Sequence, residues 1–391
     1  MINKRLELIT FSDIQDLLNN EIRESKTLEY KSILPHEGES EKIPFLASVC
    51  ALANTEGGDI VFGIRENKGI PTELLGLDVR DVDSEVLRLE NAIQTGLEPR
   101  LTRFQSKIIE DQDSKIFLVL RIQKSWNAPH RVCFKDHAKF YKRNSAGRYP
   151  MDVSELRTAF VLSEQISDRI RNFRSFRTTK IKANDDLPVP FYKGGKIAFH
   201  LVPLRAFTEN YLFEIDTKNK VFQFLMPMGS TGYNTRYNLD GLVTYSGSRD
   251  EDSISYTQFF RNGIIEAVSS LDAFSDKKII PSLAYERDLI EAAGSYLKFY
   301  KELDIEGPIY FFISLLGVKE HEFAVNREKF WRFDSPNYPL DRDDILLPEG
   351  VIESVDVIPD KIFQPYFNMV WNAYGFRKSF NYNQEEKWVG H

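Results

Sequence analysis

Three carboxylates and one lysine within the first 66 residues have the types and spacing to bind a divalent cation. Glu24 and Glu29 stand five residues apart at the start of an extended segment, and Glu66 ends a second apolar segment. If the two segments are neighbouring strands, the three carboxylates converge at one edge of a sheet. An ion such as Mg²⁺ or Mn²⁺ held there would activate water and neutralise a phosphodiester during hydrolysis. Lys31 shares the strand face of Glu29 and would hold the attacking water or the developing phosphate charge.

The same spacing also fits an ordinary solvent-facing charge pair. A Glu-x-Lys pattern on a half-exposed strand is most often a solvated pair that contributes little to stability. Glu66 would then face a loop, and Asp59 competes with it as the third acid. The spacing by itself suggests a metal site and leaves the solvated pair open.

Two basic segments are candidates for contact with nucleic acid. The first, KFYKRNSAGRYP, interleaves cations with aromatic rings, so that phosphates would pair with the cations and bases would stack on the rings. The second, DRIRNFRSFRTTKIK, carries six basic residues against one acid, although such a run is usually a solvated helix end. The alternative for the first segment is an edge strand with ordinary polar side chains. The predicted contact residues are Lys139, Tyr141, Lys142, Arg143, Arg148, Arg171 and Arg174.

Composition excludes several classes of protein. The 391 residues carry a formal net charge of −7, so a nucleic-acid partner must meet a local basic patch. Two cysteines exclude a disulfide framework, and there is no His-x-x-x-His pair, Walker loop or Gly-x-Ser-x-Gly elbow. GSTGYN at 229–234 favours a turn over a phosphate loop. The N-terminus lacks an apolar signal segment and the longest apolar run is about half a bilayer span, so we expect a cytoplasmic protein without membrane contact.

The hydrophobic pattern predicts an α/β protein with a mixed N-terminal sheet, packed helices and a second α/β or α+β domain. We expect domains at 1–163 and 184–391, joined by a basic helical linker at 164–183. In the first domain, a capping box at Ser12 and Gln15 predicts the first helix. Further helices are predicted at 43–55, 84–94 and 153–175, and strands at 27–32, 59–64, 103–110, 115–123 and 137–144.

The second half gives the same alternation of strand and helix signals. Helices are predicted at 256–271 and 283–302, and strands at 196–202, 211–216, 220–226, 242–246 and 309–316. Arg261 and Glu266 are expected to serve packing rather than chemistry. The high aromatic content predicts a large core or a surface that docks another subunit.

Four segments together resemble the AlbA_2-type domain of the Schlafen family. They are ESKTLEYK, SVCALANTEGGDIVFGIRENKGI, LGL and KFYKRNSAG, and the resemblance covers about residues 20–165. Members of this family bind nucleic acid, and some resemble nucleases that cut tRNA or rRNA with magnesium or manganese. The three acids of those nucleases fall on Glu24, Glu29 and Glu66, with Glu66 where the family usually has Asp. Lys31 matches a basic residue common after the second acid.

The resemblance implies a metal-dependent endoribonuclease acting on tRNA or another structured RNA, in a setting such as antiviral defence. The competing interpretation is a DNA-binding regulator without catalysis, in which the basic residues matter and the acids do not. An ATP-binding role would need a phosphate loop that is absent from the sequence. A third class is an interaction protein whose second half senses a partner. Schlafen-like cores also pair two related lobes, which implies either a degenerate partner lobe in the second half or a homodimer.

Overall fold

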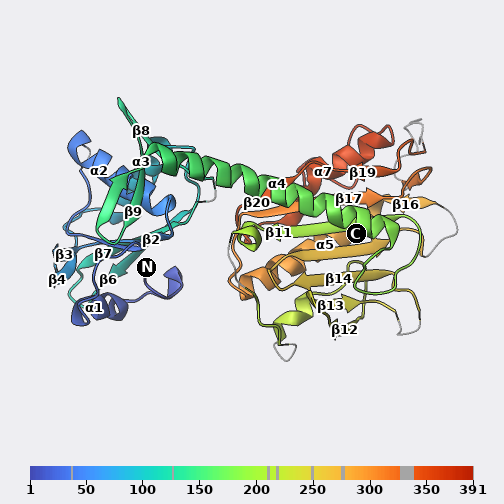
Figure 1. Cartoon of the computed structure of the whole chain (residues 1–391), viewed down its shortest axis with the longest axis horizontal. Helices are drawn as coiled ribbons and strands as arrows, with labels where there is room; N and C mark the ends of the chain where they lie inside the picture. Colours follow the sequence, from blue (N-terminus) through green and yellow to red (C-terminus); the bar gives the residue numbers. More distant parts are fainter. Residues whose placement is uncertain are drawn as a thin grey trace. The chain divides into compact units, whose positions relative to one another are not determined.

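The computed structural model describes residues 1–36, 38–125, 127–208, 212–216, 220–247, 251–273, 278–325 and 339–390. It divides into two compact units, Met1–Gln165 and Ile166–His391 (Figure 1). Both units combine sheets with packed helices, which confirms the predicted α/β class. Among the described helices, none has both the length and the apolar composition needed to cross a bilayer.

The first unit is built on a four-stranded mixed sheet in the order β1-β2-β7-β6. Strands β1 and β2 are parallel, and the other two pairings are antiparallel. Every residue of β2 is buried, as its continuous apolar sequence predicts. The strands of this sheet are β1 (Leu28–Lys31), β2 (Gly57–Phe62), β6 (Phe104–Glu110) and β7 (Ile116–Gln123).

Helices cover both faces of this sheet. On one face α2 and α3 pack over Ile60, Phe62 and Leu120. On the other face α1 and the turn η1 pack over Val61 and Val119. The helical elements are η1 (Leu6–Leu8), α1 (Phe11–Asn19), α2 (Glu39–Ala53) and α3 (Val82–Gly96).

Helix α1 has its N-cap two residues earlier than the sequence pattern predicts. Its N-cap is Thr10 rather than Ser12. The Asp13 carboxylate accepts hydrogen bonds from the Thr10 backbone N–H and hydroxyl at 2.7 and 2.9 Å. The predicted capping box of Ser12 and Gln15 was wrong, because Thr10 and Asp13 form the capping box of this helix.

Two smaller sheets complete the first unit. One has the order β10-β9-β8-β5, and the other is the hairpin of β3 and β4. Strand β9 packs against α2, so the β10-β9-β8-β5 sheet lies next to the helix that covers β1. Their strands are β3 (Ile64–Asn67), β4 (Ile70–Leu74), β5 (Leu97–Glu98), β8 (Arg131–Phe134), β9 (His137–Asn144) and β10 (Gly147–Pro150).

Helix α4 (Val153–Ala183) contributes residues to both units. It includes the whole segment 164–183, for which a basic linker is predicted. Its second half packs on the sheet of the second unit, where Ile170 and Ile181 are buried.

The second unit is built on a large antiparallel sheet in the order β12-β13-β14-β15-β11-β17-β19, with β20 also paired to β17. Helices α5 and α7 pack in one core that is dense in aromatic rings. The elements are β11 (Lys196–Pro203), η2 (Leu204–Phe207), η3 (Lys220–Phe224), β12 (Asn234–Tyr237), β13 (Gly241–Tyr245), β14 (Ser255–Phe260), β15 (Ile265–Ser270), β16 (Ile279–Pro281), α5 (Ser282–Glu302), β17 (Ile309–Leu316), β18 (Glu322–Ala324), β19 (Asp344–Leu346), β20 (Gly350–Ile352) and α7 (Pro359–Ala373).

Three predicted elements of the second half were wrong. The predicted helix at 256–271 is the hairpin of β14 and β15, which turns at Gly263 with φ of 94°. Both strands are almost fully buried, so their sequence lacks the polar alternation that marks a strand. Residues 212–216 are irregular, with 211 outside the described residues, and the predicted strand at 220–226 contains the 3₁₀ turn η3.

Candidate functional site

The candidate site lies where β1 passes beneath α2. Side chains of β1 alternate between the two faces of the sheet, so Leu28 and Tyr30 enter the core under α1. Glu29 and Lys31 therefore point to the α2 face. Gly58 allows β1 this position, because a Cβ there would lie 2.4 Å from the Thr27 carbonyl oxygen.

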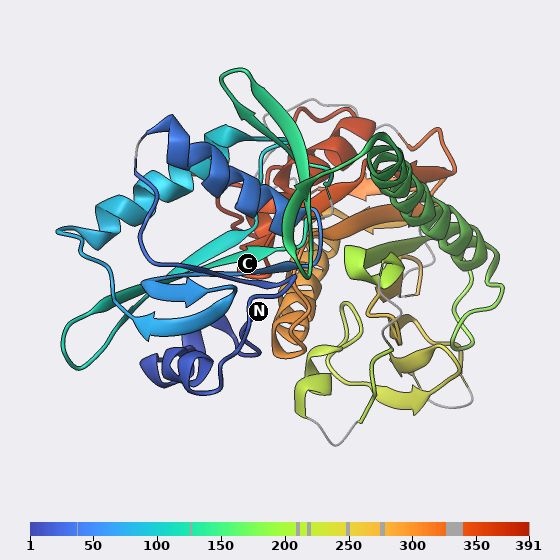
Figure 2. The ribbon, with the colours of Figure 1, turned by 60° about the vertical axis from the view of Figure 1, so that its left-hand side comes forward.

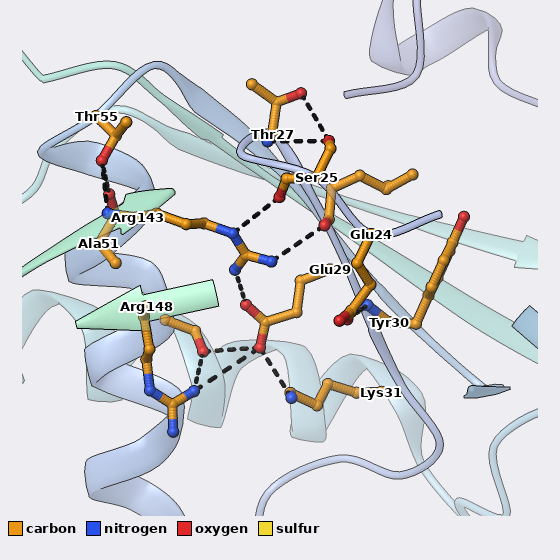
Figure 3. Close-up of polar contacts among 12 residues, drawn as sticks. Glu24, Ser25, Thr27, Glu29, Tyr30, Lys31, Ala51, Thr55, Arg143 and Arg148 are labelled. Atoms are coloured by element: carbon orange, nitrogen blue, oxygen red, sulfur yellow. Dashed lines mark hydrogen bonds and ion pairs between the residues drawn. The ribbon is translucent and has the colours of Figure 1, made fainter. Parts of the chain in front are cut away.

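The Glu29 carboxylate is almost completely enclosed, with 4% of the residue exposed. Its Oε1 accepts a hydrogen bond from the Ser48 hydroxyl at 2.8 Å and an ion pair from Lys31 Nζ at 2.8 Å. Its Oε2 pairs with the guanidinium of Arg143. Figure 3 shows Arg143 on one side of the carboxylate and Lys31 with Arg148 on the other.

These partners decide the charge of Glu29. Burial alone would raise its pKa, but the charges of Lys31 and Arg143 and the hydrogen bonds from Lys31 and Ser48 outweigh burial. The net effect lowers the pKa of Glu29 from 4.5 to about 2. Glu29 is therefore a permanent anion at physiological pH.

Arg143 is a buried anchor of this site. Its side chain is 3% exposed, and besides Glu29 it donates to the backbone oxygens of Ser25 at 2.9 Å and Leu28 at 3.2 Å. Its own backbone N–H donates to the Thr55 hydroxyl at the end of α2. Arg143 is predicted from the sequence as a contact for nucleic acid, and the structure places it inside the unit, where it ties β9 to β1.

Arg148 reaches the same carboxylate from β10. It stands directly opposite Arg143 in the β9–β10 pair, so both side chains leave the same face. Its Nη1 donates to the Ser48 hydroxyl at 2.7 Å and lies 3.9 Å from Glu29 Oε1. The side chain is 32% exposed, so Arg148 also faces solvent.

The remaining cations of KFYKRNSAGRYP do not join this cluster. Lys142 is on the opposite face of β9, with Nζ 3.9 Å from Glu155, and Tyr149 donates its hydroxyl to Glu155 at 2.8 Å. Lys139 is exposed farther along β9. Tyr141 stacks on His137 with ring centroids 5.9 Å apart and an interplanar angle of 8°. The alternation of β9 thus divides a patch that is continuous in the sequence.

Asn54 fixes the second sheet relative to α2. Its Nδ2 donates to the carbonyl oxygens of His130 at 2.8 Å and Tyr141 at 2.9 Å. Its Oδ1 accepts the His130 backbone N–H at 2.7 Å. This residue, the Asn of the ALANT segment, holds β8 and β9 where Arg143 can reach Glu29.

Glu24 closes the open edge of the sheet. Strand β1 has β2 on one side only, and Glu24 Oε1 accepts the outward N–H of Tyr30 at 2.8 Å. Burial raises the pKa of Glu24, with the Glu29 charge acting in the same direction, despite this hydrogen bond.

Glu66 lies in the β3–β4 hairpin, outside the sheet that contains β1. Its Oε2 accepts the Gly69 N–H at 2.6 Å, and the Gly69 carbonyl accepts the Glu24 N–H at 2.7 Å. Glu24 and Glu66 therefore meet at one turn residue. Glu29 points to the α2 face, where Lys31, Arg143 and Arg148 surround its carboxylate, and its charge acts on Glu24.

The three acids do not fit a divalent cation in this arrangement. Within the described part of the chain, no three His, Cys, Asp or Glu side chains are grouped to hold a metal. Glu29 has the three cations Lys31, Arg143 and Arg148 around it, and a divalent cation would have to displace them to reach its oxygens. Mg²⁺ or Mn²⁺ bound by Glu24, Glu29 and Glu66 stays a prediction from the sequence.

Comparison with known proteins assigns the first unit to a family. Residues 24–152 match the family model described as Schlafen, AlbA_2. These residues form a Schlafen AlbA_2 domain. Domains of this type are associated with nucleic-acid binding.

Two solved structures are similar to part of the chain. The N-terminal domain of a RecG-related protein from Nitrosomonas europaea has 22% identity and a TM-score of 0.28, covering 35% of this chain and 89% of that one. The DIP2311 protein from Corynebacterium diphtheriae has 14% identity and a TM-score of 0.26, covering 37% of this chain and 27% of that one. The comparison with curated proteins gives no match.

Arg171 and Arg174, the other predicted contact residues, lie outside the Schlafen AlbA_2 domain. Arg171 is 60% exposed and pairs with Glu349 at 3.1 Å. Arg174 is half-buried over the ring of Phe312 at 4.9 Å, and burial lowers its pKa. Both side chains are thus engaged with the second unit.

Two carboxylates of the second unit are fully buried: Glu266, which the sequence analysis assigned to packing, and Glu286, which it did not single out. Glu266 pairs with Arg177 at 2.7 Å and contacts His200 at 3.0 Å. Glu286 accepts hydrogen bonds from the indoles of Trp371 at 2.7 Å and Trp388 at 2.9 Å. No short sequence motif marks either carboxylate, because Arg177, Trp371 and Trp388 are 85 to 102 residues away from the acid that they contact.

Proposed function

We propose that the first unit binds nucleic acid along the hairpin of β8 and β9 and holds it without hydrolysis. The observation that carries this proposal is the projection of that hairpin beyond the body of the first unit, seen in Figure 1 and again in the rotated view of Figure 2. A two-stranded ribbon is narrow enough to enter the major groove of B-DNA. The match to a nucleic-acid-binding domain type supports the same conclusion.

The hairpin carries the side chains that such contact requires. Lys135 at its tip and Lys139 on β9 are exposed cations for backbone phosphates. The stacked rings of His137 and Tyr141, joined by a 2.9 Å hydrogen bond, stand beside them. An aromatic pair next to two cations also suits an unpaired base and its phosphate.

The cation cluster around Glu29 supports binding over hydrolysis. A catalytic carboxylate must present free oxygens to a metal ion or a water. Both oxygens of Glu29 are already paired, with Ser48 and Lys31 on Oε1 and Arg143 on Oε2. Glu24 also has one oxygen occupied, because its Oε1 accepts the backbone N–H of Tyr30.

A second candidate function is the metal-dependent endoribonuclease predicted from the sequence. It is favoured by one observation, the approach of Glu24 and Glu66 to the same Gly69. Mg²⁺ or Mn²⁺ would supply an activated water and charge neutralisation if Glu29 were released to join them. Cleavage of tRNA or rRNA, and a role in antiviral defence, follow only from this second candidate.

One experiment on the full chain separates the two functions. Fluorescently labelled tRNA, single-stranded RNA and duplex DNA are titrated with protein in Mg²⁺, Mn²⁺ or EDTA, and the same mixtures are examined on denaturing gels. We expect binding in every buffer, weakened by Lys139→Gln and unchanged by Lys361→Gln, the same charge change on α7. Intact nucleic acid in all lanes supports the binding module. Metal-dependent fragments that disappear in Glu24→Gln would establish the nuclease instead.

A further inference from the structure

We infer that Lys31 and Arg148 form a binding site for a phosphate group, at the place where the sequence motif predicts a metal ion, with Glu29 and Ser48 holding the two cations in position. The inference rests on the proposed function only for the source of the phosphate, the bound nucleic acid. Neither Lys31 nor Arg148 belongs to the β8–β9 hairpin.

The donors of this site are fixed in position by one buried anion. Lys31 Nζ and Ser48 Oγ both lie 2.8 Å from Glu29 Oε1, and Arg148 Nη1 lies 2.7 Å from Ser48 Oγ. Glu29 is itself held by buried Arg143. Cationic donors that are held before a ligand arrives lose less freedom on binding, which favours affinity.

The charge of the cluster is positive. Glu29 is one anion against the three cations Lys31, Arg143 and Arg148, which leaves two positive charges. Glu24, on the edge of the same strand, removes one of them when it is ionised. A surplus of positive charge beside the low-dielectric interior of the protein attracts anions and repels a divalent cation.

Two of the three cations are accessible to a ligand. The side chains of Lys31 and Arg148 are 43% and 32% exposed, whereas Arg143 is 3% exposed. The Nε and Nη2 atoms of Arg148 have no hydrogen-bond partner among the described residues. An exposed guanidinium edge beside an ammonium group is the arrangement that binds phosphate oxygens, because the guanidinium donates two parallel hydrogen bonds.

The ligand is therefore a phosphate ester. It is either a phosphodiester within a strand or the phosphomonoester at a strand end, since both present unesterified oxygens to Lys31 and Arg148. In this assignment Glu29 positions the two cations and does not contact the ligand. Arg143 acts one step further away, by fixing Glu29.

The test uses the full chain and isothermal titration with inorganic phosphate, then with oligonucleotides that carry a 5′-phosphate or a 5′-hydroxyl. We expect inorganic phosphate to bind, and Arg148→Gln and Lys31→Gln each to weaken it about tenfold, as loss of one charged hydrogen bond implies. Arg148→Lys retains the charge and should recover part of the affinity. Lys361→Gln is the matched control.

The outcomes are distinct. Tighter binding of the 5′-phosphate strand, lost in Arg148→Gln, assigns the site to a strand end, and equal binding assigns it to the backbone. Absence of phosphate binding, while Lys139→Gln still weakens nucleic acid, overturns the inference and keeps the proposed function. Stabilisation by Mn²⁺ that disappears in Glu29→Gln would also overturn it, because a metal would then occupy the cluster.

Discussion

Glu29→Gln is the sharpest test of the cluster beneath α2. The substitution keeps the size of the side chain and one acceptor oxygen but removes the negative charge. Arg143, which is 3% exposed, would then be a buried cation without its partner. Lys31 and Arg148 would lose the anion that holds them.

The structure sets the size of the expected effect. A carboxyl whose pKa falls from 4.5 to about 2 on folding stabilises the folded state by roughly 3 kcal/mol at neutral pH. Removal of one member of a buried ion pair costs about 3–5 kcal/mol in other proteins. We therefore expect Glu29→Gln to destabilise the first unit by about 3 kcal/mol.

The pH dependence has a defined sign. Because the pKa of Glu29 is lowered on folding, its contribution is complete above pH 4.5 and is lost as pH falls toward about 2. The wild type should therefore lose stability across this window, and Glu29→Gln should lose about 3 kcal/mol less than the wild type over the same window.

The assay is native-state hydrogen exchange on the full chain, read at the amides of β1 and β9. Exchange reports each region separately, which a single melting curve of a two-unit chain does not. Glu98→Gln is the control, because it makes the same change in an exposed pair with Arg131, where we expect at most about 1 kcal/mol. If the two variants change exchange equally, the Glu29 cluster does not stabilise the unit and the reasoning is refuted.

Three further predictions concern other contacts. Arg177→Met should lower the stability of the second unit by about 3–5 kcal/mol, read as faster exchange in β15, because Glu266 is fully buried beside it; unchanged exchange would contradict this. Lys139→Gln should reduce the slope of log affinity for nucleic acid against log salt by about 1, and an unchanged slope would remove Lys139 from the interface. Glu286→Leu should destabilise the second unit by at least about 2 kcal/mol, since Trp388 and the other donors lose their acceptor. Urea unfolding followed by tryptophan fluorescence checks this, and wild-type stability would contradict it.

The sequence predicted most of the first unit, because its elements have strong local signals. The buried strand β2 is one apolar run, and β1 alternates with period two. The hairpin of β14 and β15 was missed for the opposite reason, since burial on both faces removes the alternation. A strand buried on both faces is told from a buried helix by length and flanking residues, so the short run of β2 after Gly57 and Gly58 was recognised, whereas the longer segment 256–271 has helical length.

The candidate site was only partly predictable, because its partners come from distant strands. The sequence placed Glu29 and Lys31 on one face, as the structure shows. It gave Arg143 and Arg148 the same role, although the first is buried and the second is half-exposed. The two arginines lie opposite each other in the β9–β10 pair, and the packing of β9 against α2 encloses only Arg143.

The hydrogen bond between Glu24 and the Tyr30 N–H has a consequence for assembly. A strand edge with free N–H groups is a template on which another chain can add a strand. Glu24 occupies the N–H at the centre of β1, so a second copy could extend this sheet only after the carboxylate withdrew. An acid that the sequence analysis assigns to catalysis thus covers the N–H on which a further strand would be added to this sheet.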